Sequence, residues 1–138
     1  MNIPTRSAPR RVLVVDDNVD AGELLGMLLE QAGHCVVVTA DPLQATRLAA
    51  EFGAEVAVLD IGMPRLDGYE LAAQMRKHLG SAAPQMIALT GYGRPEDAQM
   101  IHAAGFGAHL VKPVDPAKLL AVISAAHTVG PSQAELSA

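Results

Sequence analysis

Aromatic residues and cysteine are scarce in this chain of 138 residues. Tryptophan is absent, phenylalanine and tyrosine occur twice each, and there is one cysteine. Because half of the residues are hydrophobic, the chain has enough apolar side chains for one core, which has to be mainly aliphatic. The single Cys35 excludes an internal disulfide, and we expect it to be a small buried side chain within a strand.

Long hydrophobic runs and an excess of positive charge are also missing. No apolar run approaches the roughly 18 residues that a membrane span requires, and no apolar segment with a cleavage site marks a signal peptide. The formal net charge of −5 argues against nucleic acid as a partner, because phosphate backbones are bound by basic surfaces. These absences predict a cytoplasmic protein of one domain that binds neither membranes nor nucleic acid.

Four short apolar runs each end at side chains that suit phosphoryl chemistry. Residues 12–15 precede Asp16 and Asp17, residues 56–59 precede Asp60, residues 86–89 precede Thr90, and residues 110–111 precede Lys112. Short apolar runs of this kind indicate parallel strands buried on both faces. Ligands of such sheets bind at the carboxyl edge of the strands, so we expect these five side chains to converge there.

The pattern along the chain predicts five strands that alternate with five helices. The strands are expected at residues 11–16, 34–39, 55–60, 85–90 and 107–111. The helix starts are marked by capping residues and prolines, at Asn18 or Asp20, Asp41–Pro42, Asp67–Gly68, Pro95–Glu96 and Asp115–Pro116. An apolar stripe of Ala21, Leu24, Leu25, Leu28 and Ala32 is expected to face the core. The helix at 95–104 has the thinnest apolar face and is a candidate for movement.

The fold class that follows is α/β, a flavodoxin-like three-layer sandwich. Its sheet would have five parallel strands in the order 2-1-3-4-5, flanked by five helices. Residues 11–127 would form the domain, with residues 1–10 as a flexible N-terminal arm and residues 128–138 as a flexible tail.

The three carboxylates at the predicted sheet edge point to a metal ion. Asp16, Asp17 and Asp60 would repel one another strongly unless a cation lay among them. Oxygen ligands without His or Cys favour a hard ion, Mg²⁺ or alternatively Mn²⁺. Lys112 adds a positive charge suited to phosphate oxygens, and Thr90 adds a hydroxyl. A carboxylate, a metal and a lysine are what an aspartyl phosphate requires.

These residues resemble the receiver domain of bacterial two-component response regulators. The resemblance covers residues 10–127 and rests on Asp16–Asp17, Asp60, Met63–Pro64, Asp67–Gly68, Thr90–Gly91 and Lys112–Pro113, in this order. It implies that Asp60 accepts a phosphoryl group from a phosphohistidine. It also implies that Asp17, Asp60 and the backbone carbonyl of Gly62 hold Mg²⁺, while Asp16 acts through water.

The same resemblance implies how the phosphoryl group would be sensed. Lys112 would bind one of its oxygens, and Thr90 would swing inward to another and draw the 90–95 loop with it. The position at which many relatives carry a Tyr or Phe that turns with the threonine is His109 here, which is the expected substitute. Gly62 and Tyr92 occupy two positions that tune the phosphoryl lifetime in the family.

The expected partners also come from the resemblance. The donor would be a sensor histidine kinase or a histidine phosphotransfer protein, and the output an unidentified protein target or a homodimer formed on phosphorylation. The expected switch and partner surface contains Gly91, Tyr92, Arg94, His102, His109, Pro113 and Lys118. The runs 89–93 and 109–115 are similar to receivers of hybrid histidine kinases, whereas Met1 and the arm favour a stand-alone protein. Signal output and phosphate sink both stay open.

Two other classes of function compete with this one. A magnesium-dependent phosphatase or phosphotransferase of small molecules would carry its nucleophile after the first strand in an Asp-x-Asp pattern, whereas this chain has Asp16, Asp17 and Asn18 there. A flavin or nucleotide binder would need a glycine-rich or Ser/Thr-rich loop after that strand, and the loop is acidic. The chain is therefore expected to be a signalling switch rather than an enzyme, with phosphorylation from phosphodonors and dephosphorylation as its own reactions.

Overall fold

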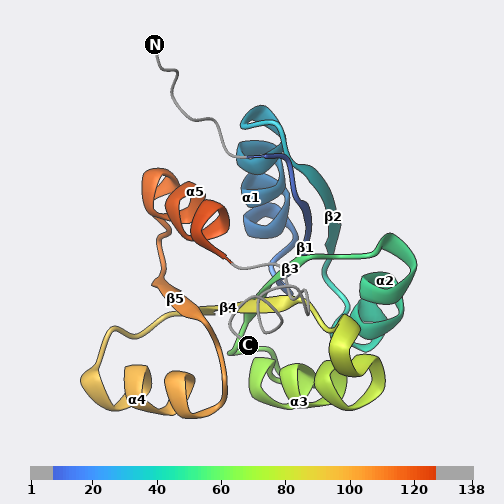
Figure 1. The fold of residues 1–138 in the computed structure, drawn as a ribbon. Helices are drawn as coiled ribbons and strands as arrows, with labels where there is room; N and C mark the ends of the chain where they lie inside the picture. The colour runs from blue at the N-terminus through green and yellow to red at the C-terminus, as the bar shows by residue number, and fades with distance from the viewer. Residues whose placement is uncertain (1–7, 127–138) are drawn as a thin grey trace, which may run out of the picture.

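Five parallel strands form one sheet in the order β2-β1-β3-β4-β5 in the computed structural model, which describes residues 8–126 (Figure 1). The strands are β1 (Arg11–Val15), β2 (Cys35–Thr39), β3 (Val56–Asp60), β4 (Gln85–Thr90) and β5 (Ala108–Val111). The strand order, the parallel pairing and the expected positions of the strands are confirmed.

Helices cover both faces of this sheet, which gives the predicted three layers. They are α1 (Val19–Gln31), α2 (Ala45–Phe52), α3 (Gly68–Leu79), α4 (Pro95–Ala103) and α5 (Pro116–Ala125). Successive side chains of a strand point to opposite faces. In β1, accordingly, Val12 and Val14 pack with α1 and α5, while Leu13 and Val15 pack with α2, α3 and α4. Both faces of the sheet are buried under helices, which explains why the central strands are apolar throughout.

Local capping explains most of the helix starts. Asn18 accepts a hydrogen bond from the backbone N–H of Ala21 and caps α1, so Asn18 rather than Asp20 is the cap. A capping box joins Asp67 and Glu70 at the start of α3, and Asp115 caps α5. Proline begins α4 and α5, as predicted.

Two expectations about local structure need correction. Asp41–Pro42 opens a short 3₁₀ turn, η1 (Pro42–Gln44), and α2 begins only afterwards; a second such turn, η2 (Gly80–Ala82), follows α3. Cys35 is exposed rather than buried. It is the first residue of β2, and β2 lies at the edge of the sheet, where burial is lower than in β1 or β3. The preceding His34 is the buried side chain.

The helix α4 buries only Ile101 fully, in line with its predicted thin apolar face. Residues 1–7 and 127–138, which contain most of the expected arm and the whole of the expected tail, lie outside the described residues. Arg10, at the end of the expected arm, donates hydrogen bonds to Nδ1 of His34 and to the carbonyl of Ser124. Within residues 8–126, no helix has the length and apolar character that crossing a membrane demands.

Candidate functional site

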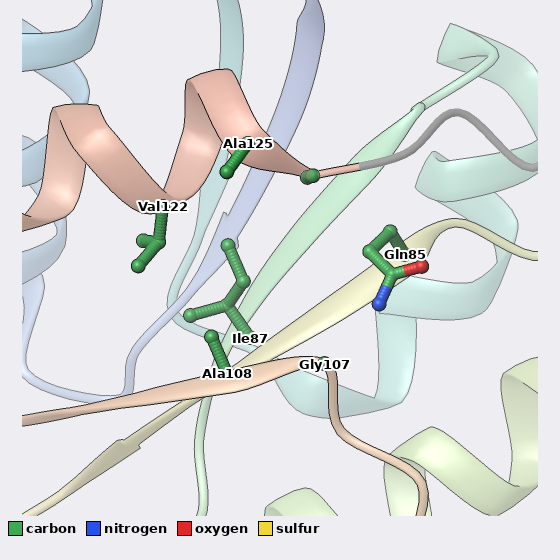
Figure 2. A pocket seen from close by; sticks show the side chains of 7 residues that line it. Gln85, Ile87, Gly107, Ala108, Val122 and Ala125 are labelled. Atoms are coloured by element: carbon green, nitrogen blue, oxygen red, sulfur yellow. The ribbon is translucent and has the colours of Figure 1, made fainter.

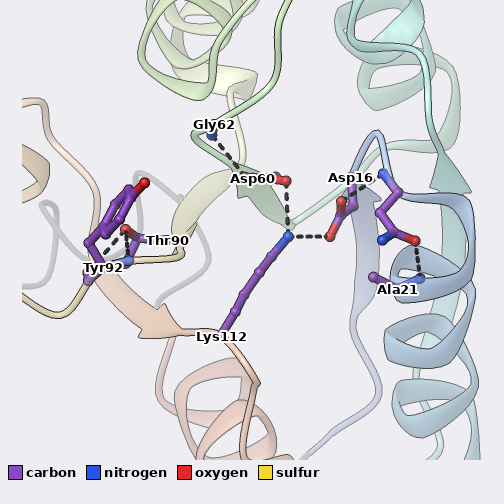
Figure 3. Close-up of polar contacts among 8 residues, drawn as sticks. Asp16, Ala21, Asp60, Gly62, Thr90, Tyr92 and Lys112 are labelled. Atoms are coloured by element: carbon purple, nitrogen blue, oxygen red, sulfur yellow. Dashed lines mark hydrogen bonds and ion pairs between the residues drawn. The ribbon is translucent and has the colours of Figure 1, made fainter.

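Four strands bring the predicted side chains to one edge of the sheet (Figure 3). Val15 of β1 pairs with Leu59 of β3, so Asp16 and Asp60, the next residues, lie side by side. Asp60 pairs with Leu89 of β4, and Thr90 pairs with Val111 of β5, which places Lys112 just beyond. The parallel register therefore assembles the group, as the strand-end argument predicts.

Lys112 joins the two buried carboxylates. Its Nζ donates to Oδ2 of Asp16 and to Oδ2 of Asp60, at 3.0 Å in each case (Figure 3). The backbone N–H of Lys112 donates to the carbonyl of Thr90 at 2.8 Å, which anchors the base of the side chain. The peptide bond that follows, Lys112–Pro113, is cis. Lys112 thus neutralises charge between two carboxylates that would otherwise repel each other.

The second oxygen of each buried carboxylate is held by the backbone. Oδ1 of Asp16 accepts from the N–H of Asn18 at 3.0 Å, and Oδ1 of Asp60 accepts from the N–H of Gly62 at 2.8 Å. Asp16 is fully buried, and Asp60 is 7% exposed. Both side chains are therefore fixed, and the side chain of Asp60 retains some contact with solvent.

Burial and the ion pairs shift two pKa values in this group. Burial is the largest influence on the pKa of Asp16 and raises it, while hydrogen bonds from Asn18 and Lys112 oppose the rise without cancelling it. Burial acts to lower the pKa of Lys112, but the hydrogen bonds and charges of Asp60 and Asp16 together raise it. The ammonium form of Lys112 is therefore favoured, as a phosphate-binding group requires.

The carboxylates fit a hard divalent cation. One oxygen each from Asp16, Asp17 and Asp60 lies within 4.8 Å of the others. Asp17 is exposed, whereas Asp16 and Asp60 are buried. This donor set consists of carboxylate oxygens without His or Cys, which suits Mg²⁺ or Mn²⁺. Gly62, whose carbonyl is the further expected ligand, is exposed next to Asp60.

Thr90 lies at the same edge, but its hydroxyl faces another way. Its Oγ1 accepts from the N–H of Tyr92 and donates to the carbonyl of Tyr92, both at 3.1 Å (Figure 3). The side chain is 2% exposed. Thr90 therefore belongs to the site by position, while its hydroxyl is engaged by the following loop.

The residues of the expected switch and partner surface are exposed and fall into three groups. A hollow of about 240 Å³ is lined by His109, Leu110, Val111, Pro113, Asp115 and Lys118. His102 on α4 and Arg94, the residue before α4, do not line this hollow, and Arg94 pairs with Asp97. Gly91 and Tyr92 are exposed in the loop between β4 and α4.

An apolar groove beside the carboxylates was not foreseen. It has a volume of about 330 Å³, opens next to Asp16 and Lys112, and is otherwise lined by Ala21, Leu24, Leu25, Leu28, Pro113, Val114 and Pro116. Leu24 was expected in the buried stripe of α1 but is 57% exposed. The signal was present in the sequence, because the adjacent Leu24 and Leu25 are about 100° apart around a helix and do not share one face.

A second groove lies at the opposite, amino edge of the sheet. It has a volume of about 230 Å³ and lies between α5 and the strands β4 and β5. Figure 2 shows Gln85, Ile87 and Val122 around it. None of its lining residues carries a charge, and it takes no part in the carboxylate site.

Comparison with known proteins gives one consistent result. The family described as response regulator receiver domain matches residues 12–124. An uncharacterised 14.6 kDa protein of Leptolyngbya boryana is 38% identical over 112 residues, which are 81% of this chain and 86% of that protein. The structure of the chemotaxis protein CheY4 of Vibrio cholerae aligns with a TM-score of 0.79 at 29% identity, over 87% of this chain and 100% of that one.

Several other curated relatives are longer. The chain is 28% identical over 115 residues, 83% of its length, to the DNA-binding transcriptional regulator RpaA of Synechocystis, and it covers 48% of that protein. The chain thus spans about half the length of such relatives. The functions that those relatives carry in the half that this chain does not match are theirs alone.

Proposed function

This chain belongs to the response regulator receiver family, and from that premise we propose that Asp60 is its phosphoryl acceptor. A receiver domain is a signalling switch of two-component systems rather than an enzyme that turns over a substrate. The observation that carries the proposal is the pair of hydrogen bonds by which Lys112 joins Asp60 to Asp16 at the carboxyl edge of the sheet.

The transfer is a displacement at phosphorus. A carboxylate oxygen of Asp60 attacks the phosphorus of a phosphohistidine, the N–P bond breaks, and the electron pair stays on the histidine nitrogen, which then takes up a proton. The Gly62 N–H on Oδ1 fixes the carboxylate that attacks. Lys112 lies 3.0 Å from Oδ2, so it needs little movement to reach a phosphoryl oxygen. Hydrolysis of the same acyl phosphate by water returns Asp60 to its free form.

The family resemblance implies the metal ligands, and the cluster of carboxylates supports them. Asp17, Asp60 and the carbonyl of Gly62 would hold Mg²⁺ directly, and Asp16 would act through a water molecule. When bound, the ion supplies positive charge to the phosphoryl oxygens. Asp17 is the exposed member of the cluster, so it is the carboxylate that an entering ion meets first.

Thr90 reports the phosphoryl group. For its hydroxyl to donate to a phosphoryl oxygen, the hydrogen bond that it donates to the Tyr92 carbonyl has to break. The 90–95 loop then moves with Thr90, and His109 on the neighbouring strand β5 fills the role that an aromatic residue has in many relatives. The surface changed by this motion is the one formed by α4, β5 and α5, with Arg94, His109 and Lys118.

The donor is a sensor histidine kinase or a histidine phosphotransfer protein. Since a protein donor has to place its phosphohistidine at Asp60, it approaches over the groove that opens beside Asp16 and Lys112. Leu24 of α1 lines this groove and is an exposed apolar side chain that such a donor can contact. Exchange of Leu24 for Lys should slow phosphorylation by any phosphotransfer protein that serves the wild type, and leave phosphorylation by acetyl phosphate unchanged. Equal slowing with both donors would contradict this approach.

Phosphorylation is expected to signal through the changed surface, which another protein would recognise. We expect a protein target or a phosphorylation-dependent homodimer, and a cytoplasmic location, with neither nucleic acid nor membrane as a partner. The similarity fits both a stand-alone switch and a receiver joined to a kinase, and it fits a phosphate sink as well as an output.

Chemical mapping of the phosphorylated residue tests the assignment. Borohydride reduces an acyl phosphate to the alcohol, so the phosphorylated aspartate becomes homoserine. After treatment with acetyl phosphate and Mg²⁺, we expect homoserine at position 60 in peptide sequencing by mass spectrometry. Homoserine at position 16 or 17 instead would contradict the choice of Asp60 and move the nucleophile to β1.

A further inference from the structure

The hydroxyl of Thr90 is held by the backbone of Tyr92, so whatever fixes Tyr92 also fixes the hydroxyl. Figure 3 shows the two residues side by side, with Lys112 just beyond the end of the next strand, β5. Both hydrogen bonds of the Thr90 hydroxyl, at 3.1 Å each, go to atoms of Tyr92. A hydroxyl has one proton to donate, so donation to the carbonyl of Tyr92 competes directly with donation to a phosphoryl oxygen.

Arg94 fixes the Tyr92 side chain and ties it to α4. Its guanidinium lies over the Tyr92 ring, 4.9 Å from the ring centroid. The same guanidinium donates to Asp97 through Nε at 2.9 Å and through Nη2 at 3.4 Å. Asp97 lies in the first turn of α4, and its side chain is only 17% exposed. A chain of contacts therefore runs from the Thr90 hydroxyl through Tyr92 and Arg94 to Asp97.

Few other contacts restrain this loop. Tyr92 is 64% exposed, and the helix that follows buries only Ile101 fully. A Cβ added at Gly91 would meet nothing within 4 Å, and one added at Gly93 would meet only the side chain of Val111, at 3.6 Å. The position of the loop thus depends on the Arg94 contacts more than on packing.

We propose that Arg94 is a positioning residue of the switch, which holds Tyr92 so that its backbone keeps the Thr90 hydroxyl away from Asp60. This inference rests on the proposed function, because the competing ligand of the hydroxyl is the phosphoryl group on Asp60. Loss of the Arg94 contacts weakens the loop conformation seen here and leaves the phosphoryl-bound conformation unaffected. It therefore shifts the population towards the bound form.

Beryllofluoride, which mimics a phosphoryl group on a carboxylate, measures this shift. The chain has no tryptophan and two tyrosines, so a Tyr69→Phe background leaves Tyr92 as the sole emitter. In this background, with saturating Mg²⁺, we expect Arg94→Gln and Asp97→Asn each to bind beryllofluoride about two- to fivefold more tightly, since exposed ion pairs contribute little individually. ¹⁹F NMR gives the bound fraction independently of the fluorophore. Unchanged or weaker binding by both variants overturns the inference.

Two controls separate positioning from a general loosening of the fold. Arg47→Gln removes an ion pair of the same length that is more exposed, Arg47–Glu51 at 2.9 Å on α2, and should leave the affinity unchanged. In a Thr90→Ala background, Arg94→Gln should have no effect, because the hydroxyl through which it acts is gone. An equal gain in affinity with and without Thr90 overturns the inference while leaving the proposed function intact. Absence of Mg²⁺-dependent beryllofluoride binding by the wild-type chain overturns both.

Discussion

At the scale of single residues, the site depends on charge balance in a small buried space. Asp16 and Asp60 each use one oxygen for a backbone N–H and the other for Lys112. Breaking a buried pair by removing one partner leaves an uncompensated charge, which is far more costly than loss of a surface pair. Lys112 therefore has a structural role as well as its proposed role in binding phosphate.

Lys112→Ala should separate these two roles. We expect Mg²⁺ binding to be retained, since the carboxylate cluster is intact, while affinity for beryllofluoride falls at least about tenfold through loss of a charged hydrogen bond. Thermal unfolding without Mg²⁺ should occur at a lower temperature than in wild type, and added Mg²⁺ should recover part of the loss. Beryllofluoride affinity equal to that of wild type would contradict the assigned role.

Asp17 offers the cleanest test of the metal site. It is exposed, and its carboxylate accepts no hydrogen bond within residues 8–126, so Asp17→Ala should change the free energy of unfolding by less than about 0.5 kcal/mol. Mg²⁺ affinity, measured by calorimetry, should fall at least about tenfold because a proposed direct ligand is lost. The matched control is Asp20→Ala, which removes an exposed carboxylate three residues further along, in the first turn of α1. Equal loss of affinity in both variants would indicate a general charge effect.

His34, which lies outside the carboxylate site, should make the free energy of unfolding depend on pH. Burial lowers its pKa below the ordinary 6.5, with a smaller contribution from the charge of Arg10, and its Nδ1 accepts a hydrogen bond from the Arg10 N–H. The unfolded chain therefore takes up the proton first as pH falls. The stabilisation that neutral His34 gives the folded state is complete above pH 6.5. It is lost as the pH falls from 6.5 towards the lower pKa that His34 has in the folded state.

Urea unfolding at pH 7.5 and pH 5.5 measures this dependence. We expect wild type to lose stability on acidification by at most about 1.4 kcal/mol per pH unit from this one proton. His34→Gln, whose amide can still accept from Arg10, should show a shallower dependence, whereas the exposed His102→Gln should behave as wild type. A slope in His34→Gln as steep as in wild type would exclude His34 as the source.

At the scale of secondary structure elements, sequence patterns predicted the features that depend on neighbouring residues alone, such as helix starts. Asn18, Asp67 and Asp115 accept backbone hydrogen bonds within their own helix starts, so capping residues were sufficient to locate α1, α3 and α5. The exposure of Cys35 was not predictable in this way, because it depends on where β2 lies in the sheet. The 3₁₀ turn after Asp41 was missed because the same Asp–Pro pair fits either kind of helix start.

The start of α3 is packed tightly against the end of β3, which explains a glycine at position 68. A Cβ on Gly68 would lie 2.6 Å from Cα of Ile61 and 2.9 Å from the carbonyl oxygen of Asp60. Because both neighbours are backbone atoms, Gly68→Ala should destabilise the fold by about 1–3 kcal/mol. Gly91→Ala, which meets nothing within 4 Å, should change stability by less than about 0.5 kcal/mol in the same chemical unfolding experiment. Equal stability of the two variants would contradict this tight packing.

At the scale of the whole molecule, the site exists because four strands end together. The sequence predicted the convergence of Asp16, Asp60 and Lys112 since each follows an apolar run, and parallel strands share a carboxyl edge. It did not predict that the Thr90 hydroxyl faces Tyr92, because a strand end fixes the place of a residue but not its rotamer. The groove beside Leu24 was also missed, since it forms between α1 and the segment after β5.

The central claim is that Asp60, with Mg²⁺, accepts a phosphoryl group. Intact mass spectrometry after incubation with acetyl phosphate tests it most directly, on wild type, Asp60→Asn and the control Asp20→Asn, each with and without Mg²⁺. We expect a gain of about 80 Da, one phosphoryl group, in wild type and Asp20→Asn with Mg²⁺ only. Asp60→Asn should remain unmodified. A gain of the same size in Asp60→Asn, or in wild type without any divalent ion, would contradict the assignment of Asp60 as the Mg²⁺-dependent acceptor.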